Sequence, residues 1–270
     1  MPTVLHEAPL ATLLPTAIDL AGKRGLIIGM ANEHSIAYGC ARAMRRLGAE
    51  LAISYASERT EPFVRPLIVQ LEAPISQVCD VEQPGDLEAL FATVRDTWGR
   101  LDFALHAVAF APQEALHGRV IDCSAAGFAQ AMDVSCHSFI RMAKLAEPLM
   151  AHGGTLLTTS FYGAQKVVEH YNVMGPVKAA LEAVVRQLAA ELGPQGVRVH
   201  ALSPGPILTR AASGIAHFDE LLAQAAEASA LHEQVSIDDV GAVAAYLVSD
   251  WSRRMTGNVV FVDGGSHIRA

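Results

Sequence analysis

The fold is decided by residues 25–39, which read GLIIGMANEHSIAYG. An apolar run ends at Gly29, a polar loop follows, and a helical apolar pattern begins at Ser35 and is closed by Gly48. This order is typical of a strand, a loop and a helix. Such a unit directs backbone N–H groups and the positive end of the helix dipole toward the loop, where a pyrophosphate can bind.

The same alternation of strand and helix repeats along the chain. We expect six further strands at 50–55, 76–79, 101–108, 155–159, 197–202 and 258–262. Helices are expected at about 61–71, 84–98, 125–150, from Asn172 onward, and at 237–249. This alternation predicts an α/β fold with a parallel sheet of about seven strands. We expect residues 1–17 to form an N-terminal arm and residues 18–270 a single domain.

The alternation stops between Pro204 and Ser236, where an irregular loop leads into an apolar helical stretch at 215–231. An insertion after the carboxyl end of a strand is a common position for a substrate lid. We therefore expect a helical lid from Ala211 to Leu231. A permanently docked helix is the alternative.

Composition excludes several classes of protein. The chain has 270 residues, 51% of them hydrophobic, and a net charge of −8, so nucleic acid and anionic membranes are not expected partners. Its four cysteines form no C-x-x-C pair and its eleven histidines are scattered, so no metal site is expected. Neither a signal peptide nor a membrane-spanning run is visible, which predicts a cytoplasmic protein.

Tyr171 and Lys178 are the candidate catalytic pair. If the chain is helical from Asn172, seven residues make two turns, and both side chains share one face about 10 Å apart. A phenol that donates to an oxyanion and a cation that binds ribose hydroxyls suit hydride transfer from a nicotinamide. The alternative for an isolated pair of this kind is an ordinary exposed helix surface.

The loop after the first strand lacks the usual G-x-G-x-x-G pattern. Only Gly29 and Gly39 are present, so the local signal for a dinucleotide is weak. Ser35 could equally be a plain helix N-cap.

Several motifs occur in an order that resembles a known family. They are Gly29-x5-Ser35-Ile36-Ala37-x-Gly39, Cys79-Asp80-Val81, Phe110-Ala111-Pro112, Tyr171-Asn172-Val173-Met174-Gly175 with Lys178, Gly196-Val197-Arg198-Val199, Gly205-Pro206-Ile207, Ala211-Ala212-Ser213-Gly214-Ile215 and Val262-Asp263-Gly264-Gly265. Together they resemble bacterial NADH-dependent enoyl-[acyl-carrier-protein] reductase, a divergent branch of the short-chain dehydrogenase/reductase family. The resemblance covers about residues 18–268.

The resemblance implies a doubly wound Rossmann fold with helices on both faces of the sheet, usually assembled as a homotetramer. It implies reduction of the C2–C3 double bond of trans-2-enoyl thioesters in fatty acid biosynthesis, with NADH as the cofactor and acyl carrier protein as the partner that carries the substrate. The catalytic residues would be Tyr171 and Lys178.

The resemblance also assigns the binding residues. The cofactor would contact Gly29, Ser35 and Ile36 at the pyrophosphate, Ala56 at the end of the second strand, Asp80 and Val81 at the adenine, Val108 and Lys178 at the nicotinamide ribose, and Ile207, Thr209 and Ala211 at the nicotinamide and its phosphate. The substrate would contact Ala111, Phe161, Tyr171 and Met174. For Asp80, an ordinary strand-end cap is the alternative.

Three residues depart from the family pattern. Phe161 occupies a position where many members have a second tyrosine, which leaves Tyr171 as the principal donor. Ala56 stands where many members have Gln, and it provides no cation to bind a 2'-phosphate. The nearby Arg59 follows Glu58, whose negative charge would repel that phosphate, so NADH is favoured over NADPH. Pro176 is compatible with a helix only in its first turn.

Two other functions remain open from the sequence. One is a ketoreductase or alcohol dehydrogenase of the same superfamily, although such enzymes usually have Tyr-x3-Lys and a Gly-rich loop. The other is a non-catalytic nucleotide-binding paralogue.

Overall fold

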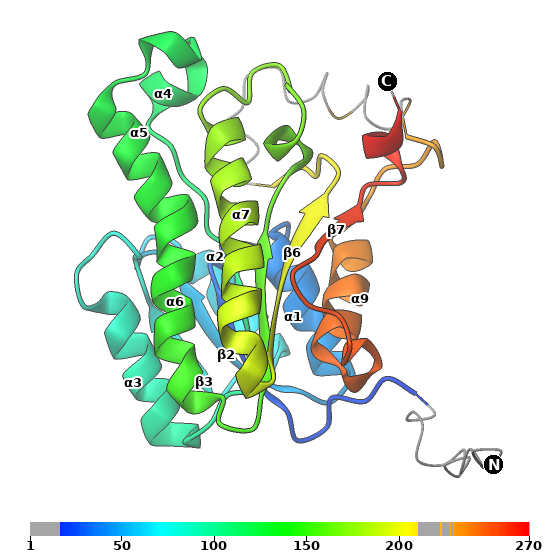
Figure 1. Cartoon of the computed structure of the whole chain (residues 1–270). Coiled ribbons are helices and arrows are strands. Elements are labelled where there is room, and N and C mark those ends of the chain that lie inside the picture. The colour runs from blue at the N-terminus through cyan, green and yellow to red at the C-terminus, as the bar shows by residue number, and fades with distance from the viewer. Residues whose placement is uncertain (1–16, 210–221, 223–226, 228, 270) are drawn as a thin grey trace, which may run out of the picture.

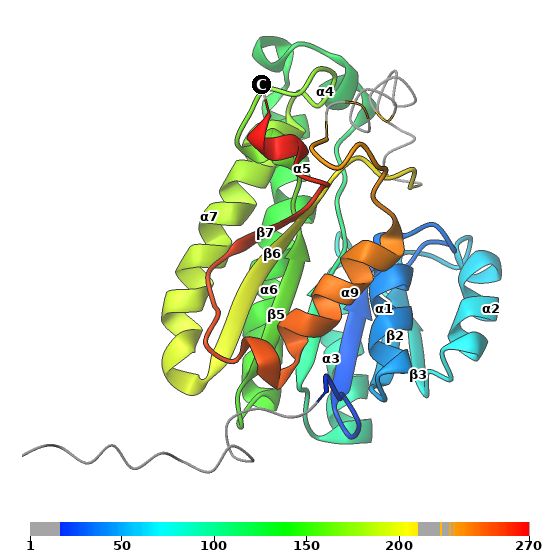
Figure 2. The same cartoon turned by 90° about the vertical axis from the view of Figure 1, so that its right-hand side faces the viewer.

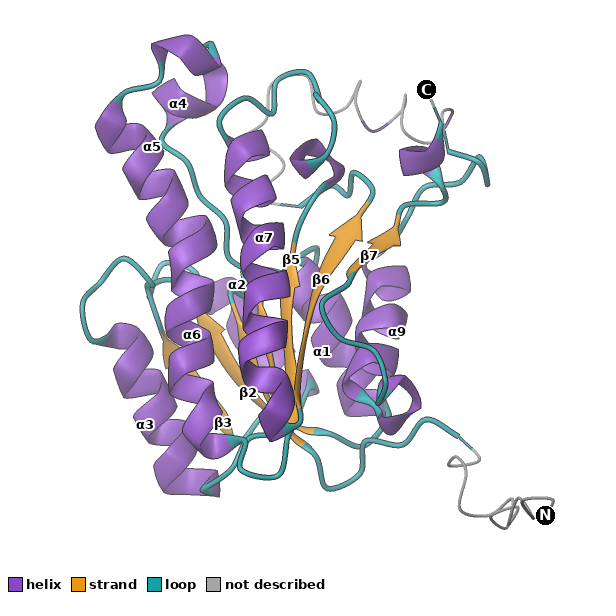
Figure 3. Ribbon diagram, viewed as in Figure 1, coloured by secondary structure: helices purple, strands orange, loops and turns teal. Residues whose placement is uncertain are grey.

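A parallel sheet of seven strands runs through the middle of the described chain (Figure 3). The computed structural model describes residues 17–209, 222, 227 and 229–269. The strands are β1 (Arg24–Ile28), β2 (Glu50–Tyr55), β3 (Ile75–Val78), β4 (Phe103–His106), β5 (Gly154–Thr159), β6 (Val197–Pro204) and β7 (Val259–Val262). The prediction of an α/β fold with about seven parallel strands is confirmed.

Helices follow the strands in sequence. They are α1 (Ile36–Arg46), α2 (Glu61–Gln70), α3 (Asp86–Trp98), α4 (Gln113–His117), α5 (Ala125–Met132), α6 (Ser138–Ala146), α7 (Met174–Leu192) and α9 (Ile237–Val248). Short 3₁₀ turns are η2 (Val120–Asp122), η4 (Glu147–Leu149), η5 (Tyr162–Ala164), η6 (Gly193–Gln195), η8 (Asp250–Ser252) and η9 (Ser266–Ile268), and a π-helical turn, η3, spans Asp133–His137. No helix among these residues is long and apolar enough to cross a membrane.

Alternate side chains of each strand enter two separate cores. In β1, Leu26 and Ile28 join the core beneath α3, α6 and α7, whereas Ile27 joins the core beneath α1, α2 and α9. Figures 1 and 2 show these two groups of helices on opposite faces of the sheet. Because both faces are covered, apolar side chains predominate on both sides of the central strands, as expected of a buried parallel sheet.

The strand order β3-β2-β1-β4-β5-β6-β7 reverses direction at β1. The chain builds outward from β1 to β3, then returns to place β4 on the other side of β1. Loops that leave the carboxyl ends of β1 and β4 therefore diverge, and the crevice between them is the usual ligand position in such sheets.

Two expected helices differ from the structure. The helix expected at 125–150 is divided by the π turn η3 into α5 and α6, and Phe128 on α5 is exposed. The helix expected from Asn172 begins at Met174 instead. The expected arm at 1–17 and lid at 211–231 lie outside the described residues, except for 17, 222, 227 and 229–231.

Gly39 has a packing function. A Cβ at this position would lie 2.2 Å from the Ile237 carbonyl oxygen at the start of α9. On the other helix, a Cβ at Gly241 would lie 2.4 Å from the Gly39 oxygen. The two glycines thus allow α1 and α9 to approach closely on one face of the sheet.

We predict that Gly39→Ala lowers the free energy of unfolding by about 1–3 kcal/mol, because the added methyl forces α1 and α9 apart. The matched control is Gly193→Ala, where a Cβ would meet no described atom within 4 Å and the backbone is already right-handed helical. The control should unfold at the same or a higher urea concentration. Equal midpoints for Gly39→Ala and wild type would contradict the packing role.

Candidate active site

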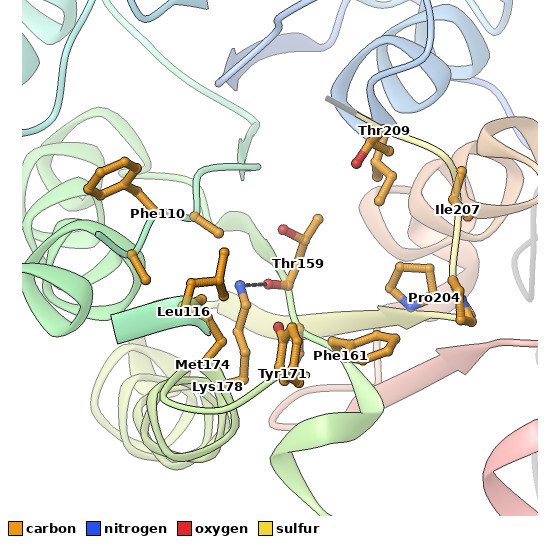
Figure 4. Close-up of a pocket in the computed structure, with 16 residues that line it drawn as sticks. Phe110, Leu116, Thr159, Phe161, Tyr171, Met174, Lys178, Pro204, Ile207 and Thr209 are labelled. Atoms are coloured by element: carbon orange, nitrogen blue, oxygen red, sulfur yellow. Dashed lines mark hydrogen bonds between the residues drawn. The ribbon is translucent and has the colours of Figure 1, made fainter. Parts of the chain in front are cut away.

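A pocket opens at the carboxyl edge of the sheet, near the crevice between the β1 and β4 loops (Figure 4). Its lining residues come from α1, α4 and α7 and from the segments after β4, β5 and β6. They are Ile36, Ala109, Phe110, Ala111, Leu116, Thr159, Ser160, Phe161, Tyr171, Met174, Lys178, Pro204, Gly205, Pro206, Ile207 and Thr209. The structure therefore brings together eight of the predicted site residues, which are Ile36, Ala111, Phe161, Tyr171, Met174, Lys178, Ile207 and Thr209.

Tyr171 is positioned by a turn that precedes α7. Its neighbours His170 and Asn172 have φ of 62° and 42°, in the left-handed region. The Asn172 side chain donates a hydrogen bond of 2.5 Å to the carbonyl of Leu116, which ties the turn to α4. Tyr171 and Lys178 thus line one pocket. They were expected to share one face of a helix that begins at Asn172, but α7 begins at Met174, and the turn before it positions Tyr171. Strained backbone of this kind is often found beside functional groups.

The phenol of Tyr171 lies in an apolar environment. The residue is 8% exposed, and its ring contacts the Phe161 ring edge to face at a centroid distance of 4.8 Å. Burial raises the pKa of the Tyr171 phenol, and the negative charge of Glu182 raises it further. No described residue hydrogen-bonds to the hydroxyl, so a protonated donor is free to face a ligand in the pocket.

Lys178 is a buried cation, with 3% of its surface exposed. Its ammonium donates a hydrogen bond of 2.7 Å to the Thr159 carbonyl at the end of β5, and Figure 4 shows this group and the Tyr171 side chain around the same space. An ammonium has three donors, so two remain for a ligand. Burial lowers the pKa of Lys178 to about 8, and this shift is opposed by Cys136 and Glu182.

The π turn η3 holds the pocket wall at Phe110. The hydroxyl of Ser135 donates to the Phe110 carbonyl at 3.0 Å and accepts from the Phe110 amide at 2.9 Å. The inserted residue of a π turn shifts the side chains that follow, and such turns are frequent at functional sites. Ser135 was not among the predicted site residues, because in the sequence it is only a polar residue within the helix expected at 125–150.

His106, at the end of β4, is a second residue that the sequence analysis missed. The Ser138 hydroxyl donates to the Val134 carbonyl, so it accepts from Nε2 of His106 at 2.7 Å. Nδ1 then accepts from Thr158 at 3.2 Å. Burial lowers the pKa of His106 to about 3, with Lys178 adding to the shift. The ring is therefore neutral and joins β4, β5 and α6.

The β1–α1 loop fits a dinucleotide pyrophosphate. Gly29 has φ of 99°, and a Cβ there would lie 2.4 Å from the Ala107 carbonyl oxygen, so only glycine fits. Ser35 occupies the N-cap position of α1, as the alternative expected, but its hydroxyl donates to the Asn32 carbonyl and makes no side-chain capping hydrogen bond. The amides of Ile36 and Ala37 open α1 and remain available to an anion, whereas the Tyr38 amide already donates to the Ser35 carbonyl at 2.9 Å.

Four other predicted cofactor residues that the structure describes lie along the same edge, outside this pocket. Ala56 is exposed after β2, and Val108 follows β4 close to Gly29. Asp80, after β3, accepts from the amide of Glu82 at 3.0 Å, so the strand-end cap that was the alternative is present. Val81 is buried beside it. Ala211 lies outside the described residues.

Comparison with known proteins gives one consistent result. The family model described as "Enoyl-(Acyl carrier protein) reductase" matches residues 29–267. The chain is 46% identical over 246 residues to enoyl-[acyl-carrier-protein] reductase [NADH] 1 of Rhizobium meliloti (strain 1021), which covers 91% of this chain and 90% of the relative. It is 43% identical over 252 residues to the FabI reductase [NADH] of Escherichia coli (strain K12), which covers 93% and 96%.

A solved structure extends this similarity to three dimensions. The reductase of the same type from Anaplasma phagocytophilum, crystallised in complex with NAD, superposes with a TM-score of 0.89 at 46% identity. The superposition covers 92% of this chain and 95% of that one. Sequence and fold therefore agree over nearly the whole length.

Proposed function

The chain belongs to the enoyl-(acyl carrier protein) reductase family, and from that premise we propose that it reduces the C2–C3 double bond of trans-2-enoyl thioesters in fatty acid biosynthesis. The observation that carries the proposal is the buried pair Tyr171 and Lys178 in one apolar pocket at the switch point of the sheet. NADH is the proposed cofactor, as in the names of the relatives.

When bound, NADH supplies the hydride that adds to C3 of the enoyl thioester. Tyr171, kept protonated by burial, donates a hydrogen bond to the thioester oxygen, where negative charge collects. Lys178 directs its two remaining donors to the ribose hydroxyls. Protonation at C2 completes the reduction. Apolar walls at Phe110, Leu116 and Met174 keep water away from the reacting carbons.

The remaining cofactor contacts complete the proposal. Gly29, Ser35 and Ile36 hold the pyrophosphate, Asp80 and Val81 the adenine, and Ile207 and Thr209 the nicotinamide side. The choice of NADH over NADPH is supported by Ala56, which offers no cation to a 2'-phosphate, and by Glu58 beside Arg59.

The proposed partner is acyl carrier protein bearing the enoyl group, as the family description implies. We also infer a cytoplasmic homotetramer in which residues 18–270 form one catalytic domain. Phe128 on α5 and Ile140 on α6 are exposed apolar side chains, which supports contact with a second copy along these helices.

A substrate comparison tests the reaction class. The purified protein should oxidise NADH in the presence of a crotonyl thioester, because hydride addition at C3 gives a charge on the oxygen beside Tyr171. An acetoacetyl thioester should not be reduced. The decrease in NADH absorbance at 340 nm measures the reaction with each thioester. Reduction of the acetoacetyl thioester alone would instead support a ketoreductase. Binding of NADH without reduction of either thioester would support a non-catalytic paralogue.

We predict that Tyr171→Phe lowers kcat by about 10²- to 10³-fold, because a single oxyanion donor is removed and the ring is kept. The Kd for NADH should change little. Tyr162→Phe is the matched control, since Tyr162 contacts Phe261 and does not line the pocket. Turnover of Tyr171→Phe within threefold of wild type would remove this residue from the mechanism.

For Lys178→Ala we predict NADH affinity weakened tenfold or more, because hydrogen bonds from a charged donor are lost. In wild type, affinity should fall as the pH rises through about 8, where the ammonium of the free enzyme loses its proton. Fluorescence titration of NADH across pH 6.5–9.5 measures both effects. The control Lys144→Ala, at an exposed position on α6, should keep the wild-type profile. A flat wild-type profile would contradict the assignment of Lys178.

A further inference from the structure

Glu182 is a buried carboxylate to which the reaction above assigns no function. It lies on the inward face of α7, one helical turn after Lys178, and is 4% exposed. Its neighbours on this face include Leu181 and Val185, which are fully buried. A charge in such a place is costly unless it is hydrogen-bonded and meets an opposite charge, so its surroundings indicate its role.

The two oxygens of Glu182 bind the two ends of one short turn. Ser160, directly after β5, donates its hydroxyl to Oε1 at 2.7 Å. Gln165, directly after η5, donates its amide to Oε2 at 3.2 Å. A single carboxylate therefore closes the turn 160–165 onto α7.

This turn packs directly against Tyr171. Phe161 contacts the Tyr171 ring edge to face. At Gly163, a Cβ would lie 2.4 Å from Cδ1 of Tyr171, so the backbone of the turn lies directly against the ring. A displacement of the turn would therefore displace the phenol. Ser160 and Phe161 also line the pocket themselves.

Glu182 also contributes to the charge around Lys178. The groups that interact with this ammonium are Cys136 from η3, His106 from β4 and Glu182 from α7, with the Tyr171 phenol lining the same pocket. Burial keeps the His106 ring neutral, and it raises the pKa of both the Cys136 thiol and the Tyr171 phenol. The Glu182 carboxylate thus opposes loss of the proton from Lys178, as Cys136 also does.

We propose that Glu182 is a positioning residue of the reductase, which holds the turn 160–165 against Tyr171 and places a negative charge one helical turn from Lys178. The inference rests on the functions proposed for Tyr171 and Lys178. It assigns Glu182 no contact with substrate or cofactor.

Two variants separate the two parts of this proposal. Glu182→Gln removes the charge but keeps the shape, because Gln165 can turn its amide and offer the carbonyl oxygen. The pH at which NADH affinity begins to fall should then move below the wild-type value, since the group that raised the pKa of Lys178 is gone. Ser160→Ala removes one end of the closure and keeps the charge. Its kcat should fall about tenfold or more, with NADH affinity within twofold and the pH profile unmoved.

The controls use the same chain. Glu191→Gln makes the same substitution at an exposed position near the end of α7 and should leave kcat and the pH profile unchanged. Glu182→Asp retains the charge with a shorter reach, so it should lower kcat and keep the wild-type profile. If Glu182→Gln does not fold, Glu182→Asp and Ser160→Ala still test the proposal.

An unmoved pH profile in Glu182→Gln, or a kcat within twofold of wild type in Ser160→Ala, would overturn the proposal for Glu182. These failures differ from failure of the proposed function. If Tyr171→Phe and Lys178→Ala behave as wild type, the catalytic assignment itself is wrong. If those two variants lose function while the Glu182 and Ser160 variants do not, only the positioning role is wrong.

Discussion

The hydrogen bond from the buried ammonium of Lys178 to the Thr159 carbonyl is the interaction on which the site depends. It joins α7 to the carboxyl end of β5, and it commits one of three donors to the fold while two face the pocket. Burial of a cation is unfavourable, which is why the pKa of Lys178 falls to about 8. The surrounding fold must compensate for this cost.

The compensation comes from polar groups buried beside an otherwise apolar core. Glu182 supplies the opposing charge one turn along α7, and its own oxygens are satisfied by Ser160 and Gln165. On the other side, the neutral His106 ring accepts and donates without adding a second positive charge. A connected polar network of this kind makes the arrangement rigid, because displacing one member leaves its partners unpaired.

The π turn η3 also helps to position polar groups beside the site. A regular helix from 125 to 146 would present a different set of side chains to β4 and its loop. At this turn, Ser135 hydrogen-bonds to the backbone of Phe110, and Ser138 hydrogen-bonds to the ring of His106. The wall of the pocket that faces Tyr171 is thereby tied to a helix that packs on α7.

By itself the sequence determined the alternation of strands and helices, because apolar periodicity is local and each strand such as 50–55 is bounded by turn residues. The motif order was also sufficient to identify the family, and with it eight of the sixteen pocket residues. Tertiary structure alone decided how Tyr171 reaches the pocket, since a left-handed Asn172 and a bond to Leu116 position it, not helical spacing. It also decided that Gly39 packs α1 on α9 and that Glu182 is buried. These facts depend on contacts between segments far apart in the chain, which no local pattern records.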